Sequence, residues 1–212
     1  MRKQHMFGGH VDVINAVGFS FTLNACLTAS SDRTIKHWDI EKGINTTSNT
    51  FTSSCFDISI SRTENMMASA HYDGAIRLWS TRDSKQIKEL KDVHDEQITC
   101  VRFTNDGHYC VSTSTDNTVK VWDVRVFKEV KAMEDDNLRV VNPTCRLCIS
   151  PDDKFCVIGS NDGKVMIFDI QKGELEEYYE DVHTTAVIGC VWQPNGIGFA
   201  TIDNLGNLFY WE

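Results

Sequence analysis

An acidic residue followed six positions later by an aromatic residue recurs along the chain, and this spacing constrains the fold more than any other feature. The pairs are Asp32–Trp38, Asp73–Trp79, Asp116–Trp122 and Asp162–Phe168, with a fifth pair, Asp203–Trp211, that carries two extra residues. Successive aromatic residues lie 41, 43, 46 and 43 positions apart. A regular period of this length predicts tandem copies of one supersecondary unit.

A second landmark keeps the same spacing. The position held by His10 is occupied in later units by Phe51, His94, Val140 and His183. Two landmarks in phase indicate one repeat domain over residues 1–212, with copies at approximately 8–39, 49–80, 92–123, 138–169 and 181–212. Each copy holds short apolar segments separated by Asp, Asn, Pro and Gly, which is typical of β-strands joined by tight turns.

Four strands in about 40–45 residues, opened by Gly-His and closed by Trp-Asp, resemble the WD-repeat family. The resemblance covers essentially the whole chain and implies an all-β WD40 propeller of five four-stranded blades. Because the family resembled has seven blades, we expect a partial, open propeller, with a closed five-bladed ring as the alternative. Residues 1–7 are interpreted as the outer strand of a preceding or closing blade.

In complete repeats of this family, a His, a Ser or Thr, an Asp and a Trp form a chain of hydrogen bonds. The resemblance assigns these roles to His10, Thr28, Asp32 and Trp38 in the first repeat and to His94, Ser112, Asp116 and Trp122 in the third. The chemistry is consistent, because an indole N–H only donates whereas a hydroxyl and a neutral imidazole both donate and accept.

The other three repeats depart from this pattern. Phe51 replaces the His of the second repeat, and Phe199 stands at the expected hydroxyl position of the fifth. The fourth repeat keeps only Asp162, beside Val140, Ile158 and Phe168. We therefore expect these three repeats to be held mainly by apolar packing.

Several functional classes are disfavoured. His94, Ser112 and Asp116 resemble hydrolase components, but a similar set recurs beside a Trp in another repeat and no G-x-S-x-G elbow exists. Cys145 and Cys148 form a lone C-x-x-C, which is a weak zinc signal. We expect no catalytic residue, no cofactor and no metal.

Charge and hydropathy limit the classes of partner that the chain is expected to bind. A formal charge of −9 argues against nucleic-acid binding, which needs clustered Lys and Arg. No apolar run approaches the roughly 18 residues of a membrane span, so membrane association is expected to be peripheral or indirect. Eight cysteines in apolar segments are interpreted as reduced core residues of a cytoplasmic protein.

In propellers of the resembled family, partners usually meet the narrower face, which is built by the loops before the first strand and between the second and third strands. The residues just before each turn Asp are therefore candidate contacts: Ser31, Tyr72, Thr115, Asn161 and Ile202. Tyr72 is the favoured anchor, because aromatic residues are enriched among interface hot spots.

The residues between the motifs suggest a particular branch of the family. HYDGAIRLWS, CRLCISPDDKFCVIGSNDGKVMIFD and the closing GCVWQPNGIGFATIDNLGNLFYW resemble the C-terminal propeller of the autophagy-related protein 16 family. That resemblance implies a scaffold that recruits cargo, receptors or membranes to the ubiquitin-like conjugation machinery of autophagosome formation.

Two alternatives stay open. The segment VSTSTDNTVKVWDVR, residues 111–125, resembles the WD-x-R signature of substrate receptors of cullin-4 ubiquitin ligases, and Arg125 would then contact the adaptor. A generic WD-repeat assembly module is the other alternative.

Overall fold

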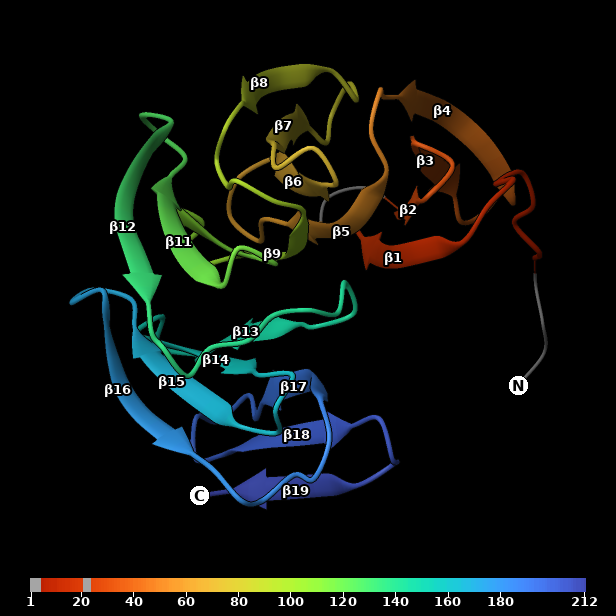
Figure 1. The fold of residues 1–212 in the computed structure, drawn as a ribbon. Helices are drawn as coiled ribbons and strands as arrows, with labels where there is room; N and C mark the ends of the chain where they lie inside the picture. Colours follow the sequence, from red (N-terminus) through yellow and green to blue (C-terminus); the bar gives the residue numbers. More distant parts are fainter. Residues whose placement is uncertain (1–4, 21–23) are drawn as a thin grey trace.

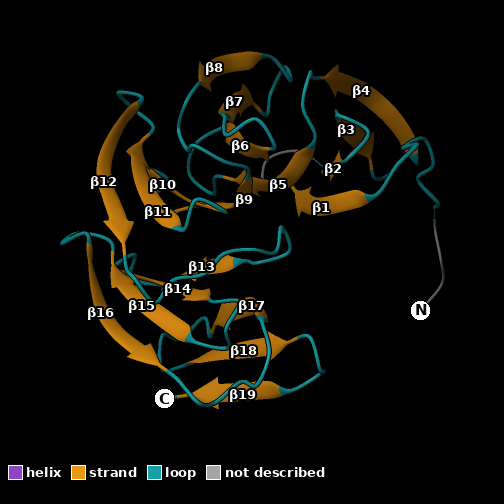
Figure 2. Ribbon diagram, in the orientation of Figure 1, coloured by secondary structure: helices purple, strands orange, loops and turns teal. Residues whose placement is uncertain are grey.

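The computed structural model describes residues 5–20 and 24–212, and these contain nineteen β-strands and connecting loops (Figure 2). In this part of the chain no helix is long and apolar enough to cross a membrane. The strands form five antiparallel sheets arranged one after another around a common axis (Figure 1). The predicted all-β propeller architecture is confirmed.

Each sheet is a meander in which strands neighbouring in sequence pair with one another. The first sheet contains β1 (Ile14–Phe19), β2 (Ala25–Ser30), β3 (Thr34–Asp39) and β4 (Ile44–Thr50). The second contains β5 (Cys55–Ile60), β6 (Met66–His71), β7 (Ile76–Ser80) and β8 (Gln86–Leu90). The third contains β9 (Ile98–Phe103), β10 (Tyr109–Ser114), β11 (Thr118–Asp123) and β12 (Lys128–Glu134).

The last two sheets differ in strand number. The fourth contains β13 (Leu147–Ile149), β14 (Phe155–Gly159), β15 (Val165–Asp169) and β16 (Glu174–Tyr179). The fifth contains β17 (Val187–Trp192), β18 (Phe199–Asp203) and β19 (Leu208–Trp211). The expectation of four strands per blade is therefore right for four sheets and wrong for the fifth, which has three strands within the described residues.

The tight turns between second and third strands explain where the strands end. Each turn needs one residue with a left-handed backbone, which the chain supplies with Arg33 (φ 66°), Gly74 (φ 70°), Asn117 (φ 65°), Gly163 (φ 90°) and Gly206 (φ 87°). At Gly74 and Gly163 a side chain would also collide with the backbone carbonyl of His94 or His183 in the next sheet. Glycine there serves both the turn and the close approach of two blades.

The hydrophobic core is divided into layers between successive sheets. One cluster joins Leu27 and Ile35 of the first sheet to Met67 and Trp79 of the second, and comparable clusters fill the next three interfaces. Each closing aromatic residue packs against the sheet before it. Trp38 of the first sheet is covered instead by Phe7, whose ring centre lies 5.4 Å from the indole.

The five sheets form an open arc. The first strand of each sheet lies innermost, and the inner strands β1, β5, β9, β13 and β17 contact one another in that order. Figure 1 shows the arc open between β1 and the sheet of β17–β19. The open-propeller prediction is thus confirmed. Of the proposed outer strand over residues 1–7, residues 5–7 form no strand and residues 1–4 lie outside the described residues.

Candidate functional site

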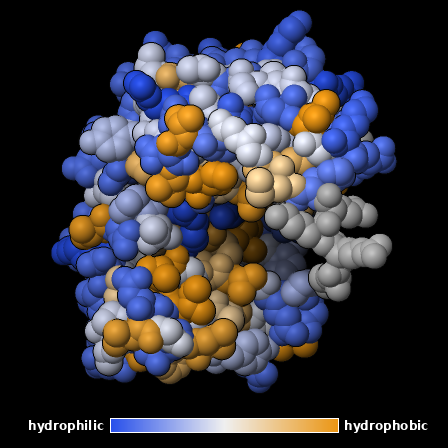
Figure 3. Space-filling view, turned by 90° about the vertical axis from the view of Figure 1, so that its right-hand side faces the viewer, coloured by the Kyte–Doolittle hydropathy of each residue, from blue (hydrophilic) through white to orange (hydrophobic). Residues whose placement is uncertain are grey.

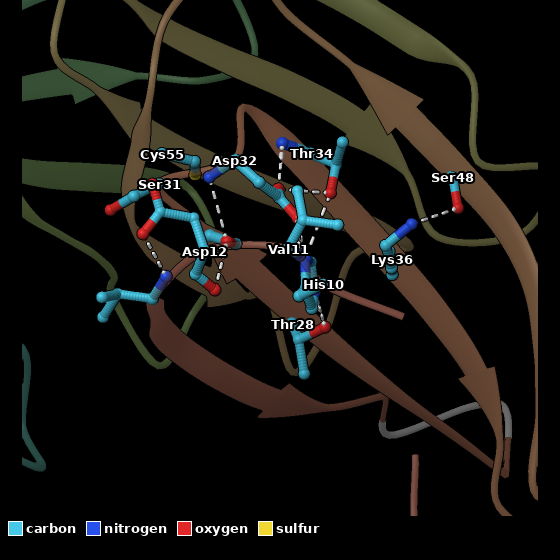
Figure 4. A network of polar contacts seen from close by, with 12 residues as sticks. His10, Val11, Asp12, Thr28, Ser31, Asp32, Thr34, Lys36, Ser48 and Cys55 are labelled. Carbon is cyan, nitrogen blue, oxygen red and sulfur yellow. Dashed lines mark hydrogen bonds and ion pairs between the residues drawn. The ribbon is translucent and has the colours of Figure 1, made fainter. Parts of the chain in front are cut away.

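A chain of polar contacts joins the segment that precedes the first strand of the first sheet to the second and third strands of that sheet (Figure 4). The segment before the first strand of each sheet is called its lead-in segment below. Trp38 Nε1 donates to Thr28 Oγ1 at 2.8 Å, and this hydroxyl lies 2.7 Å from His10 Nε2. His10 Nδ1 lies 2.8 Å from Asp32 Oδ2. If the hydroxyl donates to Nε2, Nδ1 carries the proton that Asp32 accepts, and every buried group is satisfied. The structure brings together all four residues assigned to the first repeat.

Asp32 is the charged end of this chain. Burial raises the pKa of its carboxyl, but hydrogen bonds from Thr34, His10 and the backbone N–H of Val11 outweigh burial and lower the pKa to about 2. The carboxylate therefore stays ionised at neutral pH. It fixes the position of the turn against the lead-in segment.

The third sheet repeats only part of this arrangement. His94 Nδ1 lies 2.9 Å from Asp116 Oδ2, and His94 Nε2 lies 2.8 Å from Ser112 Oγ. Trp122 Nε1 is buried and has no hydrogen-bond partner. The assignment of Trp122 to a four-residue chain is therefore wrong, because the indole packs in the core between the second and third sheets without reaching Ser112.

The second sheet has a polar chain that the sequence did not reveal. Ser69 Oγ accepts from Trp79 Nε1 at 2.9 Å and lies 2.9 Å from His71 Nε2. His71 thus supplies an imidazole from β6, while Phe51 packs edge-on against Trp79 with ring centres 5.2 Å apart. Burial, followed by the nearby charge of Arg77, lowers the pKa of His71 to about 3.

Asp73 in the same sheet takes a different partner. Its carboxylate accepts from Arg77 Nη2 at 2.7 Å, and Arg77 also pairs with Glu89 on β8 at 2.7 Å. Arg77 is buried, so both contacts hold a charge that water does not reach. The second blade therefore has a polar chain and a buried ion pair in addition to the apolar packing that was expected.

The fifth sheet also corrects the sequence reading. Thr201, not the position of Phe199, provides the hydroxyl: it lies 2.8 Å from His183 Nε2 and accepts from Trp211 Nε1 at 2.9 Å. His183 Nδ1 lies 3.0 Å from Asp203 Oδ2. This blade is polar-linked as well. The usable signal was the ten-residue spacing from hydroxyl to Trp, which is constant from Thr28–Trp38 to Thr201–Trp211.

The fourth sheet fits the expectation of apolar packing. Phe168 is fully buried in one cluster with Val140 and Ile158. Asp162 is exposed and pairs with Lys164 at 3.5 Å. No tryptophan or imidazole stands at the corresponding positions, so this blade relies on the core it shares with the third sheet.

In the three blades with an imidazole–carboxylate contact, the polar chain stabilises the turn and does not supply a nucleophile. Ser112 and Thr201 are fully buried, and Thr28 is half-buried. Each hydroxyl is bonded to an imidazole, and those of Thr28 and Thr201 also accept from an indole. A nucleophile instead needs an accessible hydroxyl facing an oxyanion site.

Each second-to-third strand turn places one corresponding residue at the same end of the arc; Tyr72, Asn161 and Asn204 are exposed there, and Ser31 and Thr115 are half-buried. The backbone N–H of each residue donates to the lead-in segment of its own sheet: Ser31 to Val13, Tyr72 to Ser54, Thr115 to Gln97, Asn161 to Arg139 and Asn204 to Ala186. These five residues are called the turn surface below. Further bonds link neighbouring blades, since Phe51 N donates to Arg33 O at 2.9 Å and His94 N to Gly74 O at 3.2 Å.

Ile202 does not belong to the turn surface. It lies within β18, paired with Gly189 and Leu208, and the turn position belongs to Asn204. The error arises because Asp203 stands two residues earlier in its blade than Asp32 does in the first. A glycine at 206 rather than directly after the Asp was the local signal.

The remaining candidates lie at different places. Tyr72 is 62% exposed on the turn surface, with Phe56 beside it at a ring separation of 6.2 Å. Arg125 lies beyond the other end of β11, where it pairs with Asp123 at 2.6 Å and stacks over Tyr109. Because β11 separates Thr115 from Arg125, the structure does not bring Arg125 together with the turn surface.

The cysteines are all unpaired thiols, and six of the eight are buried. Burial raises the pKa of the Cys145 thiol to about 12, and its sulfur lies 3.0 Å from the carbonyl oxygen of Gly159. Among residues 5–20 and 24–212, no three His, Cys, Asp or Glu side chains gather as a metal site.

Comparison with known proteins gives concordant matches. The family described as WD domain, G-beta repeat matches residues 1–39, 45–80, 84–123 and 141–169. Autophagy-related protein 16 of Arabidopsis thaliana is 32% identical over 211 residues, which cover 99% of this chain and 41% of that protein.

Two further relatives show the same pattern of coverage. Protein tipD of Dictyostelium discoideum is 30% identical over 215 residues, covering 100% of this chain and 35% of the relative. WD repeat-containing protein 70 of Xenopus tropicalis is 29% identical over 231 residues, which cover 94% of this chain and 36% of that protein. The chain thus spans about two fifths or less of the length of these relatives.

Proposed function

Because the chain belongs to the WD-repeat family, whose members are generally non-catalytic, we propose that it is a docking platform for other proteins in autophagy. The observation that carries the proposal is the 32% identity to autophagy-related protein 16 across 99% of the chain. The fold supports it, since hydrogen bonds within and between blades hold the turn surface rigidly. A rigid surface loses little conformational entropy on binding.

The finer role is recruitment. The chain brings cargo, receptors or membranes to the ubiquitin-like conjugation machinery of autophagosome formation, with membranes contacted peripherally or through other proteins. It does not bind nucleic acid, given its charge of −9. Eight free thiols suit a reducing compartment, so the proposed location is the cytoplasm.

Tyr72 is the proposed anchor of the turn surface. Its exposed ring can be removed without opening the core, so Tyr72→Ala is expected to weaken a bound partner by about 1 kcal/mol or more while the protein stays folded. Co-purification of autophagy conjugation proteins with the wild-type chain and its Tyr72→Ala variant, quantified by mass spectrometry, tests both statements. Tyr178→Ala, which removes an exposed tyrosine of β16 outside the turn surface, is the matched control.

Recovery of none of these proteins by the wild-type chain would contradict the autophagy role. Equal recovery by the wild type and Tyr72→Ala would contradict only the anchor. These two outcomes separate the proposed process from the proposed surface.

A ubiquitin-ligase receptor is the second candidate, because the side chain of Arg125 is half-exposed two residues after Asp123, the last residue of β11. In that case the ligase adaptor co-purifies with the wild-type chain and is lost with Arg125→Ala. Retention of the adaptor by Arg125→Ala, or its absence from the wild-type sample, rejects this candidate.

A further inference from the structure

The inner strands β1 and β5 border a groove of about 470 Å³ that opens toward the gap in the arc. This volume lies in the range of ligand sites. The groove has apolar flanks that include Val17 and Phe19, exposed by 62% and 65%, and its ionised side chains are Asp57, Arg102 and Arg146. Figure 3 shows this side of the molecule, where apolar side chains gather above and below a hollow with strongly hydrophilic atoms deep inside.

The groove carries more positive than negative charge, in a chain whose net charge is −9. Asp57 is buried, and its Oδ2 accepts from Arg102 Nη1 and from the backbone N–H of Val101. Among the described residues, the hydrogen bonds of the Arg102 side chain are made by Nη1, to Asp57 Oδ2 and to Val101 O, and the side chain is 32% exposed. One edge of this guanidinium is thus held by a carboxylate while the rest is free to bind a second one.

Arg146 supplies the second positive charge. Its Nη1 donates to the carbonyl oxygens of Thr99 and Pro143 at 2.7 and 2.9 Å, and its Nη2 donates to Phe56 O at 3.3 Å. These carbonyls hold the guanidinium in place without neutralising its charge. No carboxylate of the described residues forms an ion pair with Arg146, and the one carboxylate that lines the groove, Asp57, already pairs with Arg102.

The neighbouring strand favours an extended peptide over a compact ligand. β1 is the edge strand of its sheet, and its sequence INAVGF contains neither a charged residue nor proline to protect that edge. An extended segment can pair with such an edge while its alternate side chains reach into adjacent pockets.

We propose that this groove binds an extended peptide segment of a partner protein through an Asp or Glu side chain flanked by apolar residues. The carboxylate meets Arg102 and Arg146, and the apolar neighbours cover Val17 and Phe19. This inference deepens the proposed docking function by adding a site away from the turn surface.

The test uses two labelled peptides, Ac-Leu-Val-Asp-Val-Leu-amide and the same peptide with Asn in place of Asp, titrated with the full 212-residue chain by fluorescence anisotropy. The acidic peptide is expected to bind about tenfold tighter or more, as suits a charge-assisted contact. Arg146→Gln removes this preference. Arg82→Gln, which changes an exposed arginine outside the groove, leaves it unchanged.

Val17→Glu provides a second variant that does not disturb the arginine contacts, since the side chain it replaces is mostly exposed. It places a competing carboxylate at the groove and is expected to weaken the acidic peptide selectively. Equal affinity for both peptides, no binding of either, or an equal loss with Arg82→Gln overturns the proposal. If autophagy proteins still co-purify with the Arg146→Gln variant, only a role of the groove in that recruitment is rejected. If the chain discriminates between the two peptides but no autophagy protein co-purifies with it, only the autophagy role is rejected.

Discussion

At the residue scale, the blades share a geometric rule rather than a fixed set of residues. A hydroxyl ten residues before the Trp accepts the indole N–H in the first, second and fifth sheets. The lead-in segment supplies the imidazole in the first and fifth sheets, through His10 and His183, whereas β6 supplies it in the second sheet, through His71. The hydroxyl is therefore the centre of each chain, since it receives the indole and contacts the imidazole.

Removing that hydroxyl should lower the free energy of unfolding more in a blade where the hydroxyl bonds two partners than in a blade where it bonds one. Thr28→Val leaves both Trp38 Nε1 and His10 Nε2 without a partner and is expected to lower the free energy of unfolding by about 1–3 kcal/mol. Ser112→Ala affects only His94 and should cost less. Urea denaturation of both variants measures the difference. A larger loss for Ser112→Ala would contradict this account.

His71 makes stability depend on pH. Its pKa is about 3 in the folded state, far below the value of about 6.5 expected when unfolded, so between these values the unfolded chain binds more protons. The free energy of unfolding should therefore fall with decreasing pH, with His71 contributing up to about 1.4 kcal/mol per pH unit. His71→Gln cannot take up this proton. The difference between wild type and variant in urea midpoints from pH 7 to pH 4 should shrink toward acid; a constant difference would exclude this role of His71.

At the element scale, the closing aromatic residue joins each sheet to the one before it. Trp79, Trp122 and Phe168 lie in clusters shared by two successive sheets, and Trp211 packs against such a cluster. A four-stranded sheet buries its faces only by stacking on neighbours, so these residues determine how firmly the sheets associate.

Variants of Trp122 distinguish the contribution of packing to stability from that of hydrogen bonding. Trp122→Ala should lower the free energy of unfolding by about 3–5 kcal/mol through the cavity it leaves. Trp122→Phe loses no hydrogen bond, whereas Trp79→Phe also removes the bond to Ser69, worth about 1 kcal/mol more. Thermal unfolding of the three variants tests this order. A melting temperature of Trp122→Ala near that of the wild type would place the indole outside the core.

At the scale of the whole molecule, the arc leaves two sheet faces without a neighbouring blade among the described residues. Val17 and Phe19 of β1 are exposed on one side, and Leu208 and Tyr210 of β19 are 66% and 51% exposed on the other. Contiguous apolar surface beside an unpaired strand edge promotes association.

We therefore expect the 212-residue chain to self-associate as its concentration rises. Leu208→Lys combined with Tyr210→Lys should reduce this association, because charge on the open face opposes edge and face contacts. Tyr178→Lys, which changes an exposed residue of β16, is the matched control. Multi-angle light scattering at increasing concentration measures the mass. A wild-type mass that does not change with concentration, or an equal effect of the control, would contradict the expectation.

The sequence by itself determined the repeat and the number of sheets, because spacing along the chain fixes which segments become strands. The open arc was expected only from the resemblance to a seven-bladed family, and the structure decided it against a closed ring. Only the tertiary structure decided which polar atoms meet. Trp122 misses Ser112, His71 replaces the imidazole that Phe51 lacks, and Asn204 takes the place expected for Ile202.

The groove with Arg102 and Arg146 is likewise a feature that only the tertiary structure decided. Three different blades contribute Asp57, Arg102 and Arg146, which are 45 and 44 positions apart along the chain. A local pattern specifies the register within one sheet, but contacts between sheets depend on the angle and distance at which the sheets stack. That geometry results from packing all the interfaces at once, and it is therefore visible only in the folded molecule.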